Sequence, residues 1–345
     1  MAIACLTSVA TVLPGVFLVL RGVALMSDAI SHAILPGIVL MFFLVHNLDS
    51  PLLILGAALA GIATVLITET IIASKRLKKD SAIGIVFPLF FSVGIILISM
   101  YARNVHLDTD MVLLGELAFA PFNRLELWGS DWGPRALWSM GIIALINSVF
   151  ITNCYKELQL STFDPELARM LTFNPTYLYY ALMILTSITT VGAFNVVGSI
   201  VVVALMVTPP ATAYLLTHKL NIMIYSSIAI GIASSIGGYW LSHILNVSIA
   251  GAIATMSGIL FLSALLFAPE KGILASYFIT RRNKRALALQ LLRTYLATTQ
   301  TRRASLTALS RDLGWSKKYL IHLATLDNAC GLLMQDDETY IMLMQ

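Results

Sequence analysis

The segment VVGSIVVVALMVTPPATAYLL, residues 196–216, runs for 21 positions without a charged side chain. A helix of about 20 apolar residues is long enough to cross the hydrocarbon core of a bilayer. Comparable runs, each roughly 17 to 25 residues long, recur along the chain, whereas transmembrane barrels are built from short strands of alternating polarity. The pattern therefore predicts several membrane-spanning helices.

Composition agrees with this class. Hydrophobic residues make up 58% of the 345 residues, charged residues only 12%, and the mean hydropathy is +0.84. These values exclude an ordinary water-soluble globular domain. We expect an all-α polytopic membrane protein with about nine transmembrane helices. The predicted spans lie near residues 3–20, 29–46, 51–73, 83–101, 136–154, 177–193, 196–216, 222–242 and 249–268.

Lysine and arginine set the expected orientation, because loops rich in these residues stay on the cytoplasmic side. Such residues follow the first, third, fifth and seventh predicted spans: Arg21, Lys75, Arg76, Lys78, Lys79, Lys156, Arg169 and Lys219. The long loop after the fourth span carries fewer basic residues, and acidic residues such as Asp108, Asp110 and Glu116 balance them. The N-terminus is therefore expected outside, with the C-terminal region in the cytoplasm.

Residues 270–345 differ in composition from residues 1–269, the predicted transmembrane domain. They contain 11 of the 22 Lys and Arg residues and no apolar run long enough to span a bilayer. The pattern predicts a helix at 284–299, the segment SLTALSRDLG (305–314) with a turn at Gly314, and a helix from Ser316 to about Ala329. A hairpin, LLMQDDETYIML (332–343), follows with its polar tip at Asp336 to Glu338. This order predicts a small cytoplasmic winged-helix-like α+β domain. Its expected core consists of Leu306, Leu309, Leu313, Trp315, Leu320 and Leu323.

Two ionisable residues, Asp28 and His32, lie one helical turn apart within the apolar stretch LVLRGVALMSDAISHAILPG (18–37). An ionisable side chain at the middle of a transmembrane helix costs about 3 kcal/mol to insert, so a function is expected. Pro36 has no N–H for the carbonyl of His32, which frees another oxygen. Oxygen and nitrogen donors can replace the water ligands of a divalent transition metal. Two other interpretations remain open: Ser27 or Asp28 could cap the helix, and His32 could be a hydrogen-bonded core histidine.

Glu69, near the end of the third predicted span, is the third candidate ligand. If the second and third spans are antiparallel, Glu69 and Asp28 lie at similar depth. The alternative is a surface pair between Glu69 and Lys75 or Arg76. One imidazole and two carboxylates suit manganese, zinc or ferrous iron, and the absence of a thiolate argues against copper(I).

The segment TFDPELARMLTFNPTYL (162–178) predicts a short helix between two spans. Thr162 or Asp164 can cap this helix, Pro165 suits its first position, and Glu166 lies near its positive end. An amphipathic linker on the membrane surface is the alternative interpretation.

Four segments resemble the permease subunits of ATP-binding-cassette importers for manganese, zinc or iron. They are FLVLRGVALMSDAISHAILPGIVL (17–40), KKDSAIGIVF (78–87), TFDPELARMLTFNP (162–175) and the 196–216 span. The resemblance implies an inward pump for a divalent transition metal, manganese first, in a bacterial cytoplasmic membrane. It also implies that Asp164, Pro165, Glu166 and Ala168 contact an ATPase.

The expected partners are an ATPase subunit dimer, an identical or related second permease, and an external metal-binding solute-binding protein. The pattern GxxxxGK[ST] does not occur in the sequence, so we expect a non-enzyme whose ATP is hydrolysed by a partner. No permanently bound cofactor is expected, since the metal ion is the transported substrate.

Two alternatives remain from the sequence. An autonomous secondary transporter or channel could use Asp28, His32 and Glu69 as a cation or proton relay. The tail, with Arg302, Arg303, Arg311, Lys317 and Lys318, could bind DNA. We favour an interaction or regulatory domain over nucleic-acid binding, because the tail is tethered to a membrane domain and its charges also suit anionic lipid or an ATPase.

Overall fold

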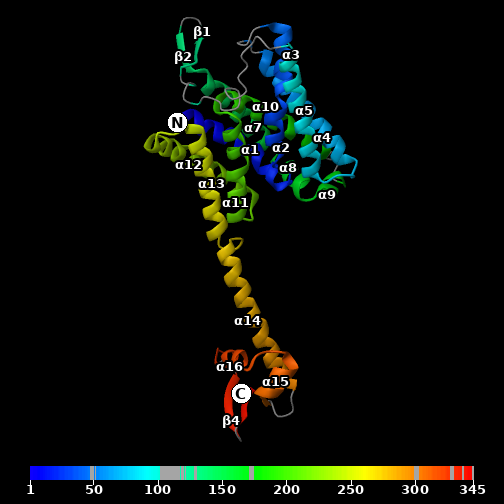
Figure 1. Cartoon of the computed structure of the whole chain (residues 1–345), viewed down its shortest axis with the longest axis vertical. Helices are drawn as coiled ribbons and strands as arrows, with labels where there is room; N and C mark the ends of the chain where they lie inside the picture. The colour runs from blue at the N-terminus through cyan, green and yellow to red at the C-terminus, as the bar shows by residue number, and fades with distance from the viewer. Residues whose placement is uncertain are drawn as a thin grey trace. The chain divides into compact units, whose positions relative to one another are not determined.

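The computed structural model describes residues 1–46, 50, 52–101, 117, 120, 122–127, 130–170, 175–298, 303–326, 330–335 and 338–343. Within these residues, nine helical segments are long and apolar enough to cross a membrane (Figure 1). They are α1 (Ala2–Leu20), α2 with α3 (Met26–Val45), α4 (Leu52–Ala73), α5 (Lys79–Tyr101), α7 (Arg135–Asn153), α10 (Pro175–Val197), α11 (Ser199–Leu216), α12 (Leu220–Leu245) and α13 (Ile249–Phe267). Each agrees with a predicted span to within a few residues, which confirms the prediction of about nine membrane-spanning helices.

Helix α1 lies at the centre of the bundle. Thirteen of its 19 residues are buried, and it packs against α7, α10, α11 and α12. The side chain of Asn147 on α7 fixes part of this core, since its Nδ2 donates to the Ala10 carbonyl at 2.9 Å and to the Thr189 hydroxyl at 2.8 Å. A helix that is apolar on every side must be surrounded by other elements or by lipid, and neighbouring helices surround most of α1.

The second span is broken at Ile34 into α2 (Met26–Ala33) and α3 (Leu35–Val45). Pro36 explains the break, because it cannot donate to the carbonyl of His32 and its ring would clash with that carbonyl in a regular helix. The helix resumes with the bond from Ile38 N to Ile34 O at 3.1 Å. His32 is therefore in the last turn of the first half-helix.

Two short helices, α8 (Tyr155–Phe163) and α9 (Pro165–Met170), connect α7 to α10. The guanidinium of Arg21, just after α1, donates to hydroxyls of Ser161 and Thr162 on α8. Lys79, at the start of α5, donates to the Arg21 carbonyl at 2.9 Å. The connections after α1, α4 and α7, three of those predicted to be cytoplasmic, thus meet at one end of the bundle.

The long connection between α5 and α7 contains a feature that the sequence did not predict. Strands β1 (Arg124–Leu127) and β2 (Ser130–Pro134) form an antiparallel hairpin. An ion pair between Arg124 and Asp131 links the strands. The acidic residues Asp108, Asp110 and Glu116, on which part of the orientation argument depends, lie outside the described residues.

Packing divides the chain into two compact units, Met1–Leu265 and Leu266–Gln345. The sequence placed this boundary near Pro269. The second unit contains α14 (Ile273–Thr298), β3 (Arg303–Ser305), α15 (Leu306–Leu313), α16 (Lys317–Leu326), β4 (Cys330–Gln335) and β5 (Glu338–Leu343).

The three strands of this unit form an antiparallel sheet in the order β3-β5-β4. Gly314 makes the turn between α15 and α16 with φ = 69°, a conformation that favours glycine. The predicted core residues pack in one cluster with Leu292, Leu296 and Ile341. The predicted helix–turn–helix–hairpin order is therefore present, although α14 begins earlier than expected. Residues 336–337, at the predicted hairpin tip, lie outside the described part.

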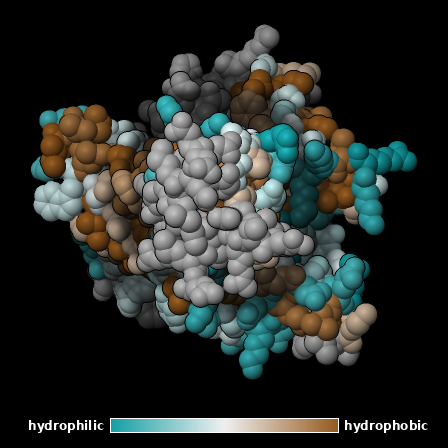
Figure 2. Space-filling view, turned by 90° about the horizontal axis from the view of Figure 1, so that it is seen from below, coloured by the Kyte–Doolittle hydropathy of each residue, from teal (hydrophilic) through white to brown (hydrophobic). Residues whose placement is uncertain are grey.

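Much of the transmembrane unit's outer surface is apolar, and apolar side chains appear over broad areas of the face in Figure 2. Helix α5 illustrates this, since Ile85, Leu89 and Ile96 are all more than half exposed. An apolar surface of this kind requires lipid or another protein to cover it.

Candidate functional site

Asp28 and His32 lie one turn apart on α2, as their spacing predicted. The His32 Nε2 atom is 3.4 Å from Asp28 Oδ1, and the two side chains are 31% and 40% exposed respectively. The opposite face of α2 is buried, with Met26, Ala29 and Ile30 in a core cluster. Because that face is packed in the core, the Asp28 and His32 side chains lie on the partly exposed face of α2.

The geometry bears on the two alternative interpretations of this pair. The N-cap of α2 is Leu25, and within the described residues no side chain caps this helix. Asp28 is therefore not a helix cap, and its carboxylate is free to interact with His32. His32 is not a buried core histidine either, because about a third of its side chain is exposed.

Two aromatic rings from α5 flank the imidazole. The ring centroids of Phe87 and Phe91 each lie 6.0 Å from that of His32. These rings restrict the imidazole orientation and exclude water from one side, so a cation bound by His32 would be partly desolvated. The remaining exposed side could accept further ligands.

Glu69 occupies a different environment from the other two predicted ligands. Its carboxylate accepts a hydrogen bond from the Tyr179 hydroxyl of α10. Over the part of the chain that the structure describes, no group of three or more His, Cys, Asp or Glu residues could hold a metal ion. The structure therefore brings Asp28 and His32 together but does not add Glu69 to them. Neither Lys75 nor Arg76 forms the expected pair with Glu69 among the contacts described.

The predicted short helix is present and is capped as expected. The main-chain N–H of Leu167 donates to Asp164 Oδ1 at 3.0 Å, and Pro165 is the first residue of α9. Asp164, Pro165 and Glu166 are exposed. Ala168, by contrast, is 1% exposed. Its predicted role as a direct contact for a partner does not fit this structure, because its side chain packs inside the transmembrane unit.

Sequence reasoning missed three exposed apolar residues around α9. Phe163, Leu167 and Met170 are 61%, 43% and 82% exposed. Together with Glu166 they form what we call the α9 surface. Leu167 and Met170, three residues apart on α9, share a face, and this spacing was the available signal. Phe163 is the last residue of α8 and is joined to α9 through Asp164.

The sequence indicates only a topological role for the charge of Arg21, yet in the structure this residue contacts several elements. Its Nη2 donates to Ser161 Oγ at 2.8 Å, and its Nε donates to Thr162 Oγ1 at 3.1 Å. Its Cζ lies 5.1 Å from the centre of the Tyr179 ring. Because Tyr179 also bonds to Glu69, a continuous polar chain connects α8, the end of α1, α10 and α4.

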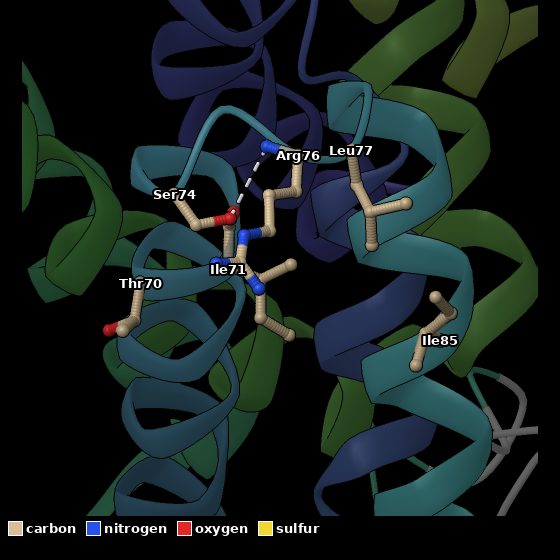
Figure 3. Close-up of a pocket in the computed structure, with 6 residues that line it drawn as sticks. All are labelled: Thr70, Ile71, Ser74, Arg76, Leu77 and Ile85. Atoms are coloured by element: carbon tan, nitrogen blue, oxygen red, sulfur yellow. Dashed lines mark hydrogen bonds between the residues drawn. The ribbon is translucent and has the colours of Figure 1, made fainter.

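An open groove of about 620 Å³ lies where α4 turns into α5. Figure 3 shows its lining residues, and the main-chain N–H of Arg76 donates to Ser74 Oγ at 3.4 Å there. The lining consists of Thr70, Ile71, Ser74, Arg76, Leu77 and Ile85. The groove is thus distinct from the Asp28–His32 pair.

Comparison with known proteins decides the family. The sequence model of the ABC 3 transport family matches residues 1–268, which include the whole transmembrane unit. The chain belongs to the ABC 3 transport family. The resemblance to metal-importer permeases that the four sequence segments indicated is therefore confirmed.

Two relatives from this comparison have named transport systems. The manganese transport system membrane protein MntD of Bacillus subtilis is 42% identical over 269 residues, covering 78% of this chain and 91% of the relative. The zinc transport system membrane protein TroD of Treponema pallidum is 46% identical over 297 residues, covering 86% of this chain and 80% of the relative. The second alignment is longer than the family match, so it includes part of the C-terminal unit.

A solved structure supports the ABC 3 fold as well. PsaBC from Streptococcus pneumoniae, in complex with a Fab, superposes with a TM-score of 0.62 at 30% identity. The match covers 78% of this chain and 91% of that chain.

Proposed function

We propose that the chain is the transmembrane subunit of an importer that moves a divalent transition metal into the cytoplasm, with manganese as the first candidate and zinc or iron as alternatives. The Asp28–His32 pair, on a broken helix of an ABC 3 family member, is the observation that carries this proposal. The names of the manganese and zinc transport relatives support the substrate class.

The ligand chemistry suits such a substrate. A carboxylate oxygen and an imidazole nitrogen match the preferences of manganese, zinc and ferrous iron. The open side of the pair leaves room for water or for ligands from another subunit, and a site with few protein ligands binds moderately enough to release its ion. Glu69 would join this site only after leaving Tyr179, so we assign the metal contact first to Asp28 and His32.

The energy source in this proposal is an ATPase subunit dimer. The α9 surface offers exposed apolar side chains beside the Glu166 carboxylate, and the Asp164 cap holds the short helix rigid. Asp164, Pro165 and Glu166 remain the proposed polar contacts. A second permease, identical or related, and an external metal-binding protein complete the proposed assembly in a bacterial cytoplasmic membrane.

The proposed orientation places the N-terminus outside and the C-terminal unit in the cytoplasm. Arg21, Lys79 and the α8–α9 connection meet at one end of the bundle, and basic residues concentrate at cytoplasmic ends. For the C-terminal unit we propose a winged-helix fold that serves as an interaction or regulatory domain.

Substitution of the pair tests the metal site. Asp28→Asn and His32→Gln should each reduce Mn²⁺ uptake by cells that express the complete complex more than tenfold. The first removes the negative charge of the carboxylate and the second the imidazole nitrogen, and neither changes the size of the side chain greatly. Amounts of protein in the membrane should stay normal. The matched control is Asp80→Asn, since Asp80 also lies in the first turn of a helix but belongs to the exposed surface.

Two outcomes would contradict the proposal. Normal uptake of manganese, zinc and iron by both variants would remove the metal site. Metal movement into liposomes that contain this chain alone would favour the autonomous transporter, because a permease should be inactive without its ATPase.

A further inference from the structure

A chain of polar contacts connects α8, the helix that precedes α9, to α4, and the Asp28–His32 pair takes no part in it. The contacts run from Ser161 and Thr162 on α8 to the Arg21 guanidinium. They continue from Arg21 to the ring of Tyr179 and from the Tyr179 hydroxyl to the Glu69 carboxylate. We call Arg21, Tyr179 and Glu69 the clasp.

The clasp joins segments that are far apart in sequence. Arg21 and Ser161 are separated by 140 residues, and Glu69 and Tyr179 by 110. The three residues come from the end of α1, from α10 and from α4, so a single cluster connects three membrane-spanning helices. Through Ser161 and Thr162 it also reaches the short helix that directly precedes α9.

Arg21 is held from both its main chain and its side chain. Its carbonyl accepts a hydrogen bond from Lys79 Nζ at 2.9 Å, while its guanidinium donates to α8. Directly after it, Gly22 adopts φ = 66°, and this tight turn leads into α2. A displacement of Arg21 is therefore transmitted over a short distance to the helix that carries Asp28 and His32.

The shape of the Arg21 side chain fixes the geometry of these contacts. A guanidinium presents its N–H groups in a planar fork, so it can bond two neighbouring hydroxyls and still lie over an aromatic ring. Arg21 and Glu69 carry opposite charges, and both contact Tyr179. Tyr179 lies between the opposite charges and bonds one while its ring faces the other.

We propose that Arg21, through Tyr179 and Glu69, is a positioning residue that couples movement of α8 and α9 to the transmembrane helices. When α9 moves with the ATPase, α8 moves with it. The Arg21 bonds then move the end of α1 and the start of α2 in the same step. Tyr179 on α10 and Glu69 on α4 move with them. This inference rests on the proposed function, because it requires an ATPase at the α9 surface.

A purely structural cluster would behave differently from a coupling element. Loss of a structural contact lowers stability, and ATP hydrolysis and transport then fall in parallel with the amount of folded complex. Loss of a coupling contact leaves ATP hydrolysis in the assembled complex and lowers the number of metal ions moved for each ATP. This ratio is therefore the decisive measurement, since demonstrated coupling is needed before contiguous contacts count as a pathway.

The experiment uses the complete complex of permease and ATPase in liposomes, with Mn²⁺ uptake and ATP hydrolysis measured together. Tyr179→Phe removes the hydroxyl bond to Glu69 and keeps the ring beneath Arg21. We expect the ratio of Mn²⁺ moved to ATP hydrolysed to fall at least fivefold, with hydrolysis within about twofold of wild type. The control is Tyr177→Phe, the same change on the same helix at a residue that is 75% exposed.

Thr162→Val gives an independent test, because it removes one acceptor of Arg21 at a partly exposed position with almost no change in shape. It should lower the ratio at least twofold, and it decides the question if Tyr179→Phe does not yield folded complex. If the folded variants move as much Mn²⁺ per ATP as wild type, the coupling role of the clasp is contradicted and the proposed function is not affected. A wild-type complex that hydrolyses ATP without moving any of the three metals contradicts the proposed function, and the clasp with it.

Discussion

The carboxylate of Asp312, in the C-terminal unit, accepts a hydrogen bond from the Tyr295 hydroxyl at 2.6 Å and another from Arg311 Nε at 3.3 Å. These two bonds hold the pKa of Asp312 below its ordinary value, and the bond from Tyr295 has the larger effect. Both bonds stabilise the charged form of Asp312, and the Tyr295 bond, which links α14 to α15, is strongest while Asp312 is ionised. Their contribution to stability is present above the ordinary aspartate pKa and is lost as the pH falls through the lower folded value.

Tyr295→Phe should therefore raise the pKa of Asp312 and move the acid unfolding of the C-terminal unit to a higher pH. The physical reason is the loss of the donor that contributes most to the shift. An NMR titration of the Asp312 carboxyl carbon in the isolated unit measures the pKa directly. Tyr319→Phe, the same change in a tyrosine that packs on Trp315, serves as the control. Identical titration curves for Tyr295→Phe and wild type would refute this account.

Individual residues differ in how far the sequence could place them. The Asp28–His32 contact was predictable, because residues four apart on a helix must share a face. The bond between Glu69 and Tyr179 was not predictable. It depends on how α4 packs against α10, and the local sequence does not determine that packing. Arg21 likewise looked like a topology signal, and only the folded chain brings it to Ser161 and Thr162.

Among the elements, α1 and α11 approach each other unusually closely. A Cβ atom at Gly15 would overlap the main-chain carbonyl of Met206. That carbonyl has no regular helical donor, because residue 210 is proline. The carbonyl that Pro210 leaves free on α11 and the glycine on α1 therefore lie at the same point of contact, and the absence of a side chain at Gly15 allows the two helices to approach closely.

Gly15→Ala should lower the free energy of unfolding by about 1–3 kcal/mol, a typical cost of overfilling a packed interior. The backbone of α11 cannot rotate away from a new methyl group as a flexible side chain can. Thermal unfolding of the purified protein in detergent measures the change. Gly258→Ala is the control, because a Cβ there meets no atom within 4 Å. Equal stability of the two variants would show that α1 and α11 can separate without cost.

The α9 surface makes a second prediction at the level of elements. Leu167→Ala should weaken binding of the ATPase by about tenfold, because burial of a leucine side chain contributes roughly 1.5–3 kcal/mol and alanine retains only part of it. Retention of the ATPase by the purified permease measures this. Leu137→Ala, on α7, is the control with a similar exposure of 37% against 43%. Equal retention by both variants would place the ATPase contact elsewhere.

Elements also show what the sequence could not predict. Apolar length placed the nine spans, and Pro36 accounts for the break at Ile34. The burial of Ala168 was not predictable, because α9 has only six residues and too little periodicity to identify its inner face. The β1–β2 hairpin was missed because its strands are short and rich in charged, Trp and Gly residues, so they lack a clear apolar alternation.

The whole molecule consists of two units with separate cores. The cluster of Leu292, Leu309 and Leu320 and its neighbours contains only residues of Leu266–Gln345. A unit with its own core and sheet should fold without the transmembrane helices. This independence allows the function of the C-terminal unit to be tested apart from transport.

The C-terminal unit should not bind duplex DNA at about micromolar concentration in a gel shift. Arg311 already bonds to Asp312, so fewer basic side chains on α15 and α16 are available to phosphates. Phosphate binding by several lysines and arginines weakens steeply as salt rises, which makes a salt series the discriminating measurement. Lys317→Glu combined with Lys318→Glu is the matched variant, because both side chains are exposed on α16. If the wild-type unit binds DNA, and this binding is lost in the double variant and with added salt, the unit is a nucleic-acid-binding domain. Its assignment as an interaction domain would then be wrong.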